Sequence, residues 1–462
     1  MTDFQLIVIG AGPGGYMAAL RAAKKGLRTA VIESREAGGT CLNRGCVPTK
    51  ALLHSSQVYS DALSGAQMGV SAGEVSIDIE AMYAHKKQIV EKLSGGVESL
   101  LKAAKVEFIR GHGSICAPGE VRVCTAEGEE QTYTAQNILV ATGSVPARPP
   151  IPGLELPGVV TSDELLDGDA KLHRSIVIIG GGVIGVEFAT FYSDLGCRVS
   201  IVEGLDRLLP NMDRELGQNL AQLLKKKGVQ IFTNAMVERV EQAEDGLRVC
   251  FSAKGAAGEA TGDAVLCAIG RRPNTEGLFP GELQPEMDGR RIRVDASFGT
   301  SIPGVYAIGD VSSPVQLAHV ATAQGENCVD MLCGESAGID MNIVPGCIYC
   351  RPEIASVGLC EADAKAAGIP VKVGKCTLFS NARTLIADTG RSFMKVVAHA
   401  QTHAILGAQL MCDRCTDMIT QISQAIAHGL TVEQMLRVMR PHPTYEEALT
   451  EALEDLLAKL SR

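Results

Sequence analysis

Two cysteines with an unusual spacing, Cys41 and Cys46, lie in the segment GGTCLNRGCVPTK, residues 38–50. A regular helix rises about 1.5 Å per residue, so this spacing would hold the two Cα atoms further apart than the roughly 7 Å that a disulfide tolerates. The intervening residues LNRG suit a distorted backbone, and Pro48 suits the first turn of a following helix. A helix N-terminus near Cys46 would lower the pKa of its thiol and favour the thiolate.

Three kinds of site are compatible with this pair: a redox disulfide, a zinc site and two unpaired buried thiols. No second cysteine pair at ligand spacing lies near residues 38–50, which argues against zinc. Because the pair follows a nucleotide-binding fingerprint by about thirty residues, we interpret it as a redox disulfide beside a flavin. Another pair, Cys347 and Cys350, is not interpreted as redox-active, since a strand would point these two side chains to opposite faces.

Dithiol chemistry also needs a base, and His442 is the candidate. Histidine has a suitable pKa, and a carboxylate can orient its ring and stabilise the imidazolium. Two acids follow His442 closely enough in the sequence to pair with it, Glu446 at i+4 and Glu447 at i+5. Helical spacing slightly favours Glu446. His442 precedes the predicted amphipathic helix, however, so its ring need not follow helical geometry. A structural histidine is the alternative interpretation.

The elements that position these groups include a strand-turn-helix-strand unit at residues 4–33. Gly10, Gly12 and Gly15 have GxGxxG spacing after an apolar strand, and the next strand ends on Glu33. One glycine makes the tight turn, one admits a pyrophosphate, and one lets the helix pack on the strand. The helix N-terminus attracts phosphate, and Glu33 can accept hydrogen bonds from a ribose. This unit predicts a dinucleotide site.

The same unit recurs with Gly180, Gly182, Gly185 and Glu203, and the acid again stands 23 positions after the first glycine. Two fingerprints imply two dinucleotides. A carboxylate at Glu203 favours a free ribose hydroxyl, as in NAD, and would repel the extra phosphate of NADP, although Arg207 lies four residues downstream.

Strands that end in glycine or aspartate outline the domains. Asp310 follows a strand whose end resembles those of the first unit, so we expect the chain to return to the first domain. The region from about residue 340 has no glycine fingerprint and reads as an antiparallel sheet with helices, for which an interface role is the default. The predicted division is 1–145 with 271–340 for the first, discontinuous domain, 146–270 for the second, and 341–462 for the interface domain.

Length and composition are consistent with this division. The 462 residues suit about three domains. The 50 glycines and a hydrophobic fraction of 46% fit an α/β protein, while 43 basic against 53 acidic residues disfavour nucleic acid or an anionic membrane as a partner. The apolar segment 176–192 is interrupted by glycines, so it is predicted to be a strand-turn-helix rather than a membrane span. We expect a cytoplasmic protein without a secretory signal and with mostly free thiols.

Six segments carry a resemblance to a known family: IGAGPGG, GGTCLNRGCVPTK, GGGVIGVE, AIGRRPN, GVYAIGD and HPTYEE. In this order and at these intervals they resemble the pyridine nucleotide-disulfide oxidoreductases, and the resemblance extends over essentially the whole chain. It implies an α/β protein with two Rossmann-like domains, one for FAD and one for NAD, and a C-terminal α+β dimerisation domain. Arg44 is a departure, because many relatives carry valine there.

The resemblance also implies roles for single residues. Cys41 would be the thiol that meets the substrate and Cys46 the thiol at the flavin, while His442 would be the base with Glu447 as its partner. The remaining implied residues are Lys50 paired with Glu187 beside the flavin; Gly10, Gly12, Gly15, Glu33, Gly39, Thr40, Lys50, Gly113, Thr142, Gly143, Ser144, Asp310, Gln316, Leu317, Ala318 and His319 for FAD; and Gly180, Gly182, Val183, Gly185, Glu187, Glu203, Val237 and Gly270 for NAD.

The implied activity is oxidation of protein-bound dihydrolipoamide to lipoamide by a homodimer, with His442 reaching the cysteines of the other subunit. The implied partner is the lipoylated protein of a 2-oxoacid dehydrogenase or glycine cleavage complex, and no metal or membrane is expected. Glutathione reductase is a rival that Glu203 disfavours. Mercuric reductase is a rival that is disfavoured because its C-terminal cysteine pair is missing from the end AKLSR and because His442 is present. A flavin-binding scaffold without turnover is the rival from a different class.

Overall fold

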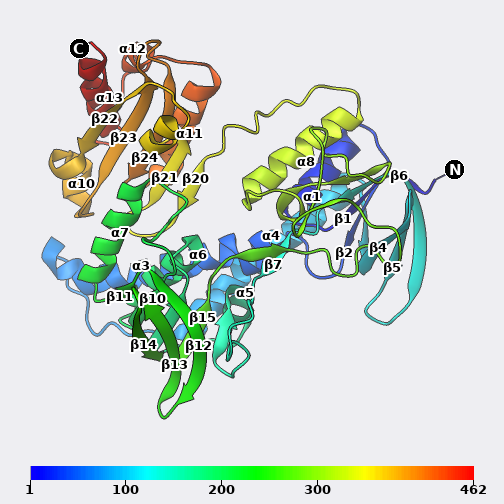
Figure 1. Cartoon of the computed structure of the whole chain (residues 1–462), viewed down its shortest axis with the longest axis horizontal. Coiled ribbons are helices and arrows are strands. Elements are labelled where there is room, and N and C mark those ends of the chain that lie inside the picture. The colour runs from blue at the N-terminus through cyan, green and yellow to red at the C-terminus, as the bar shows by residue number, and fades with distance from the viewer. Residues whose placement is uncertain (1, 462) are drawn as a thin grey trace.

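The computed structural model describes residues 2–461, and their largest sheets have seven, five and five strands (Figure 1). The seven-stranded sheet has the order β3-β2-β1-β6-β5-β4, with β19 paired to β6. Its strands are β1 (Phe4–Ile9), β2 (Thr29–Glu33), β3 (Glu107–Arg110), β4 (His112–Ala117), β5 (Glu120–Cys124), β6 (Glu130–Val140) and β19 (Val305–Ala307). Strand β1, FQLIVI, is almost entirely apolar because it lies between two parallel neighbours with both faces covered.

Helices α1 (Pro13–Lys24) and α8 (Ala318–Leu332) lie side by side on this sheet (Figure 1). Arg21 of α1 donates to both carboxylate oxygens of Asp330 on α8, at 2.8 and 2.7 Å. Strand β19 immediately precedes this part of the chain and runs parallel to β6, with Val305 opposite Ile138. Residues 305–332 therefore pack with the N-terminal sheet, although all strands of the second sheet lie between β6 and β19 in the sequence.

The second sheet repeats the design of the first. Its order is β11-β10-β9-β15-β8, with parallel neighbours throughout. Its elements are β8 (Val159–Thr161), α5 (Ser162–Asp167), β9 (Ser175–Ile179), α6 (Val183–Asp194), β10 (Arg198–Val202), α7 (Arg214–Lys226), β11 (Gln230–Phe232) and β15 (Ala264–Cys267). An antiparallel sheet of β12 (Ala235–Ala243), β13 (Gly246–Ala253) and β14 (Ala256–Gly262) packs with it.

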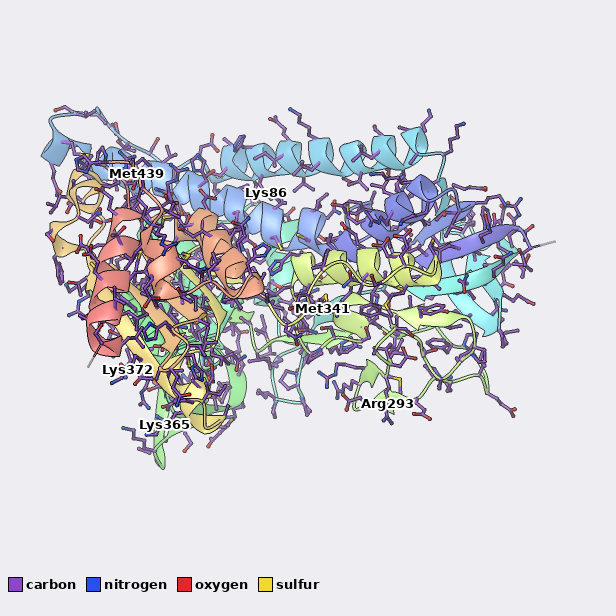
Figure 2. All side chains as sticks on the ribbon, turned by 90° about the horizontal axis from the view of Figure 1, so that it is seen from above. Lys86, Arg293, Met341, Lys365, Lys372 and Met439 are labelled. Carbon is purple, nitrogen blue, oxygen red and sulfur yellow. The ribbon has the colours of Figure 1, made fainter. Side chains whose placement is uncertain are left out.

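Three helices, α2 (Gly39–Arg44), α3 (Cys46–Ser64) and α4 (Ile79–Ala103), lie between β2 and β3 in the chain and contact elements of the second unit. Helix α3 packs against α6, and α4 holds the short helix α5. The Tyr83 hydroxyl of α4 donates to the Leu165 carbonyl at 3.2 Å. The ammonium of Lys86, which is labelled in Figure 2, donates to the Leu166 carbonyl. Helix α5 is thus fixed against α4, which belongs to the segment between β2 and β3.

The C-terminal sheet is antiparallel and has the order β20-β21-β24-β23-β22, with α11 and α13 packed on it. Its elements are β20 (Gly346–Ile348), β21 (Ile354–Gly358), α9 (Glu361–Ala366), β22 (Val371–Thr377), α10 (Ala382–Ala387), β23 (Phe393–His399), β24 (Ile405–Met411), α11 (Cys415–Ala427), α12 (Val432–Leu436) and α13 (Glu447–Leu460). The smaller elements of the chain are η1 (Gly65–Met68), β7 (Ser144–Pro146), β16 (Arg271–Pro273), β17 (Met287–Asp288), β18 (Arg291–Ile292), η2 (Gly309–Val311) and η3 (Leu378–Ser380).

Two expectations about local structure meet different outcomes. The apolar segment 176–192 folds as β9, a glycine turn and α6, and no helix within residues 2–461 combines the length and apolarity needed to span a bilayer. The expectation that Cys347 and Cys350 share one strand is wrong, because β20 ends at Ile348. Cys350 instead lies in the following turn, where its thiol donates to the Pro352 carbonyl at 3.1 Å.

Candidate active site

The two cysteines of the predicted redox pair lie on either side of a break between α2 and α3. Gly45 forms the break with φ −145° and ψ −109°, and Cys46 is the first residue of α3. The Thr49 hydroxyl of the first α3 turn donates to the Gly45 carbonyl at 2.7 Å. The distorted backbone that the cysteine spacing predicts is therefore present, and it places Cys46 at a helix N-terminus.

The two neighbouring thiols shift each other's pKa in opposite directions. The pKa of Cys46 is lowered to about 7, because the Cys41 thiol donates to it and the Lys50 ammonium attracts the thiolate, while burial opposes both effects. The pKa of Cys41 is raised, first because its proton is shared with Cys46 and second by burial. These directions favour the thiolate form at Cys46 and the protonated thiol at Cys41 in the reduced pair.

Lys50 and Glu187 form an ion pair that joins α3 to α6. The Lys50 Nζ lies 2.8 Å from Glu187 Oε2 and 2.9 Å from Oε1, and Glu187 is 3% exposed. The Tyr349 backbone N–H donates to the same carboxylate at 3.1 Å, and the ring of Tyr349 lies 4.8 Å from Lys50 Nζ. Because a buried carboxylate needs compensation, these contacts hold Lys50 in one position, one helical turn beyond Cys46.

Each glycine fingerprint combines a closely packed third glycine with an open second one. A Cβ on Gly15 would lie 1.9 Å from the Gly10 carbonyl oxygen, and a Cβ on Gly185 would lie 2.0 Å from that of Gly180. A Cβ on Gly182, in contrast, would meet nothing within 4 Å. The third glycine therefore packs helix on strand, and the second leaves room for a ligand, as a dinucleotide requires.

The two strand-end acids hold the fingerprint loops in place. The N–H of Ala11 donates to Glu33 at 2.8 Å, and the N–H of Gly181 donates to Glu203 at 2.6 Å. In each acid the other oxygen accepts from the backbone N–H two residues downstream. Each carboxylate oxygen keeps a further lone pair, so the acids can still accept from a ribose hydroxyl.

A single cavity of about 1920 Å³ connects the two fingerprints and the cysteine pair. It is larger than the roughly 300–1,000 Å³ of an ordinary ligand pocket, so it has room for two dinucleotides. Among the sequence-predicted residues, Gly15 and Gly185 do not line it, in keeping with their packing role, and neither do His442 and Glu447. The others do: Gly10, Gly12, Glu33, Gly39, Thr40, Cys41, Cys46, Lys50, Gly113, Thr142, Gly143, Ser144, Asp310, Gln316, Leu317, Ala318, His319, Gly180, Gly182, Val183, Glu187, Glu203, Val237 and Gly270.

Asp310 brings a half-buried carboxylate into the cavity. The Ser144 hydroxyl donates to Asp310 Oδ2 at 2.6 Å, and burial raises the pKa of this carboxyl. Arg271 donates to the Ser144 hydroxyl at 2.8 Å and pairs with Asp163 of α5 at 3.0 Å. Arg271 and Arg44 both line the cavity. The sequence predicted neither as a site residue and indicated only that arginine is unusual at position 44.

The candidate base is paired with an acid, and neither residue lines the cavity that Cys41 and Cys46 line. His442 Nδ1 lies 2.8 Å from Glu447 Oε1, and the Thr444 N–H donates to Glu447 Oε2 at 2.9 Å. Both contacts lower the pKa of Glu447, the backbone contact more. The spacing argument for Glu446 is wrong, since Glu446 accepts from Gln421 at 3.3 Å. The His442 side chain is 73% exposed.

Two family models match the chain. Residues 4–325 match the model described as pyridine nucleotide-disulphide oxidoreductase, and residues 344–453 match the dimerisation domain of the same family. Among curated relatives, a dihydrolipoyl dehydrogenase of Geobacillus stearothermophilus is 38% identical over 98% of this chain and 96% of the relative. A mitochondrial dihydrolipoyl dehydrogenase of Pisum sativum is 37% identical over 97% of this chain and 90% of the relative.

Solved structures agree over the same span. LpdA of Mycobacterium tuberculosis has a TM-score of 0.88 at 28% identity and covers 97% of this chain and 99% of its own. The HOCl-induced flavoprotein disulfide reductase RclA of Escherichia coli has a TM-score of 0.86 at 28% identity, covering 98% and 99%. The predicted fold class and the predicted enzyme class, a flavoprotein disulfide oxidoreductase that uses FAD and NAD, are thereby confirmed. The chain belongs to the pyridine nucleotide-disulphide oxidoreductase family.

Proposed function

We propose that this chain oxidises protein-bound dihydrolipoamide to lipoamide and passes the electrons through the Cys41–Cys46 pair and FAD to NAD. One observation supports this most: both thiols, the Lys50–Glu187 ion pair and both glycine fingerprints line the same cavity. Curated relatives of Geobacillus stearothermophilus and Bacillus subtilis that match along nearly the whole chain are named dihydrolipoyl dehydrogenase, and each is 38% identical.

The proposed thiol exchange starts from the Cys41–Cys46 disulfide. One substrate thiol gives its proton to the partner subunit's His442 and attacks Sγ of Cys41. The Cys41–Cys46 bond breaks, and Cys46 leaves as a thiolate that the α3 N-terminus and Lys50 stabilise. The second substrate thiol then displaces Cys41 from the mixed disulfide and gives it a proton. The substrate leaves as lipoamide, and the pair has gained two electrons.

The cofactors act next to this pair. FAD would be held by Gly10, Gly12, Glu33 and Asp310, and NAD by Gly182 and Glu203. When bound, FAD supplies the two-electron acceptor for the dithiol and NAD takes up the hydride. Lys50, fixed by Glu187, keeps a positive charge beside the Cys46 thiolate.

The dimer is part of the proposal because the base must come from a second copy. The match to the dimerisation domain supports a homodimer. The C-terminal part of the chain also exposes large apolar side chains that a partner can cover, including Met439 at 92% (Figure 2). The others are Phe379, Leu385, Ile386 and Val438.

The test replaces Cys41 with serine and measures dihydrolipoamide-dependent NAD reduction by the holoenzyme. We expect the activity to fall at least about 1,000-fold, because the exchange has no second nucleophile of the same kind. Cys333→Ser, at an exposed cysteine, is the matched control and should keep full activity. Full activity in Cys41→Ser would overturn the scheme.

A panel of acceptors separates the rival functions. Reduction of glutathione disulfide with NADPH would indicate a glutathione reductase, and bound FAD without any turnover would indicate a scaffold.

We further propose that the FAD-binding domain comprises residues 1–145 and 271–340, that residues 146–270 bind NAD, and that residues 341–462 form the dimer interface. A lipoylated protein in the cytoplasm is the proposed partner, and co-purification of a lipoylated chain would test it.

A further inference from the structure

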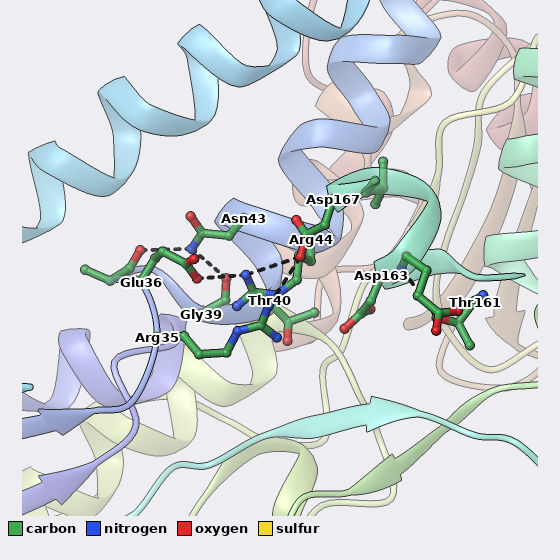
Figure 3. Close-up of polar contacts among 12 residues, drawn as sticks. Arg35, Glu36, Gly39, Thr40, Asn43, Arg44, Thr161, Asp163 and Asp167 are labelled. Carbon is green, nitrogen blue, oxygen red and sulfur yellow. Dashed lines mark hydrogen bonds and ion pairs between the residues drawn. The ribbon is translucent and has the colours of Figure 1, made fainter. Parts of the chain in front are cut away.

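Arg44 is the last residue of α2 and lies between the two redox cysteines in the sequence, immediately before the break at Gly45. It is 5% exposed, although arginine is one of the residues least often buried. Its guanidinium lies between two carboxylates from different parts of the chain, one after β2 and one at the end of α5 (Figure 3). A buried charge in this position must be compensated, so these carboxylates decide where the end of α2 lies.

One terminal nitrogen of Arg44 makes both contacts. The Nη1 atom donates to Glu36 Oε2 at 2.7 Å and lies 3.6 Å from Asp167 Oδ2. Glu36 belongs to the loop just upstream of the cysteines, and Asp167 belongs to the helix that follows the edge strand β8 of the second sheet. Arg44 thus connects the cysteine segment to both dinucleotide-binding halves.

The anchor at Asp167 does not depend on Arg44. Helix α5 is held by the Tyr83 and Lys86 side chains of α4, which donate to the Leu165 and Leu166 carbonyls. Arg35 also reaches Asp167, at 3.3 Å, from outside the cysteine segment. Asp167 is therefore a fixed point, and Arg44 is the residue through which the cysteine segment is attached to it.

We infer that Arg44 is a positioning residue for the Cys41–Cys46 pair, which it holds at a fixed separation by fastening the C-terminal end of α2 to Glu36 and Asp167. Closing a disulfide between two thiols is favoured when the backbone already holds them near each other. Without the fastening, Gly45 can let α2 turn relative to α3, so the two thiols spend less time at bonding distance. The dithiol form then becomes relatively more populated.

This inference rests on the proposed role of Cys41 and Cys46 but is tested without lipoamide or turnover. The holoenzyme is equilibrated in fixed mixtures of reduced and oxidised dithiothreitol, the free thiols are alkylated, and mass spectrometry of the peptide containing residues 38–50 gives the dithiol-to-disulfide ratio. Arg44→Met, which keeps the length of the side chain and removes its charge, should raise this ratio about five-fold, equivalent to about 20 mV for a two-electron couple.

Two control variants separate positioning from a merely structural role. Arg35→Met removes a charge from the same Asp167 without touching the cysteine segment, and its ratio should stay within about two-fold of that of the parent protein. Arg44→Lys should restore the parent ratio, because a single nitrogen makes both of the native contacts. If Arg44→Met destabilises the fold, Asp167→Asn releases the same contact from the other side and should shift the ratio in the same direction.

The possible outcomes are distinguishable. If Arg44→Met leaves the ratio within two-fold of the parent, lowers it, or is matched by Arg35→Met, the inference is wrong while the proposed function stands. If the parent protein shows no disulfide between Cys41 and Cys46 in any mixture, the proposed function fails first.

Discussion

Lys50 Nζ lies 2.8 Å from Glu187 Oε2 across the junction between α3 and α6, so the helix that starts at Cys46 is fixed by an acid from the second glycine-fingerprint unit. Glu187 is buried and its carboxylate also accepts the Tyr349 N–H. The position of a cation beside Cys46 is therefore set by residues from three separate segments of the chain.

Replacing Glu187 with glutamine tests this arrangement. The amide keeps the shape of the side chain but leaves Lys50 without its counter-ion, so we expect a loss of about 2–4 kcal/mol in the free energy of unfolding and a reduced turnover number. Thermal and denaturant unfolding, together with NAD reduction, measure the two effects. Glu91→Gln, in an exposed pair with Lys87, is the matched control and should change neither. Equal behaviour of the two variants would contradict the role given to Glu187.

The low pKa of Cys46 predicts how the reduced enzyme reacts with iodoacetamide. Because the folded-state pKa is about 7, the thiolate is populated above that pH, and the alkylation rate should rise through a midpoint near it. Cys41→Ala removes the largest cause of the shift, the hydrogen bond from the Cys41 thiol, so its midpoint should move upward towards the ordinary value for cysteine, about 8.5.

The same shift has a consequence for stability. A depressed pKa stabilises the folded reduced protein above the pKa of unfolded cysteine, and this contribution disappears as the pH falls through 7. An unchanged alkylation midpoint in Cys41→Ala would show that the thiol pair does not share a proton.

Mixing two inactive variants tests where His442 acts. Cys41→Ser and His442→Gln homodimers should each be inactive, but a mixed dimer combines the intact cysteine pair of one chain with the intact histidine of the other. After subunit exchange we expect about a quarter of the parent activity, since half of the dimers are mixed and each has one complete site. If the exchanged mixture stays inactive, although mass spectrometry detects mixed dimers, His442 acts within its own chain.

Glu203 should set the preference for NAD over NADP. Its carboxylate fixes the second fingerprint loop through the Gly181 and Leu205 N–H groups, and its charge would repel a ribose phosphate. Glu203→Gln should therefore lower kcat/KM for NAD about ten-fold and reduce the ratio of the NAD to the NADP value. Glu259→Gln, at an exposed acid of the neighbouring β14, serves as control. A parent-like cofactor ratio in Glu203→Gln would contradict this assignment.

Local geometry explains which parts of the site the sequence could predict. The break between Cys41 and Cys46 was predictable because helical rise and disulfide length are incompatible at that spacing, and Gly45 supplies the break. The fingerprint turns were predictable because each glycine is needed for its own steric role: a Cβ on Gly15 would clash with the backbone, whereas the space at Gly182 stays open for a ligand.

Other parts depend on how distant segments dock. Spacing favoured Glu446 over Glu447 for His442, but α13 starts only at Glu447, so helical periodicity does not apply between these residues. No sequence pattern links Arg44 to Asp167, because their approach follows from the docking of α5 on α4. The alternation expected for Cys347 and Cys350 failed for a simpler reason, since β20 is only three residues long.

The pairing of β19 with β6 has a consequence for synthesis on the ribosome. Ile138, Leu139 and Val140 are fully buried, and β19 covers one edge of this part of β6. That edge has no partner until residues 305–307 have emerged, by which time the entire second sheet has been made. A nascent chain therefore carries an open, apolar strand edge while residues 141–304, about a third of the chain, are being made. A chain that terminates within this interval keeps the edge open, and unpaired strand edges promote aggregation.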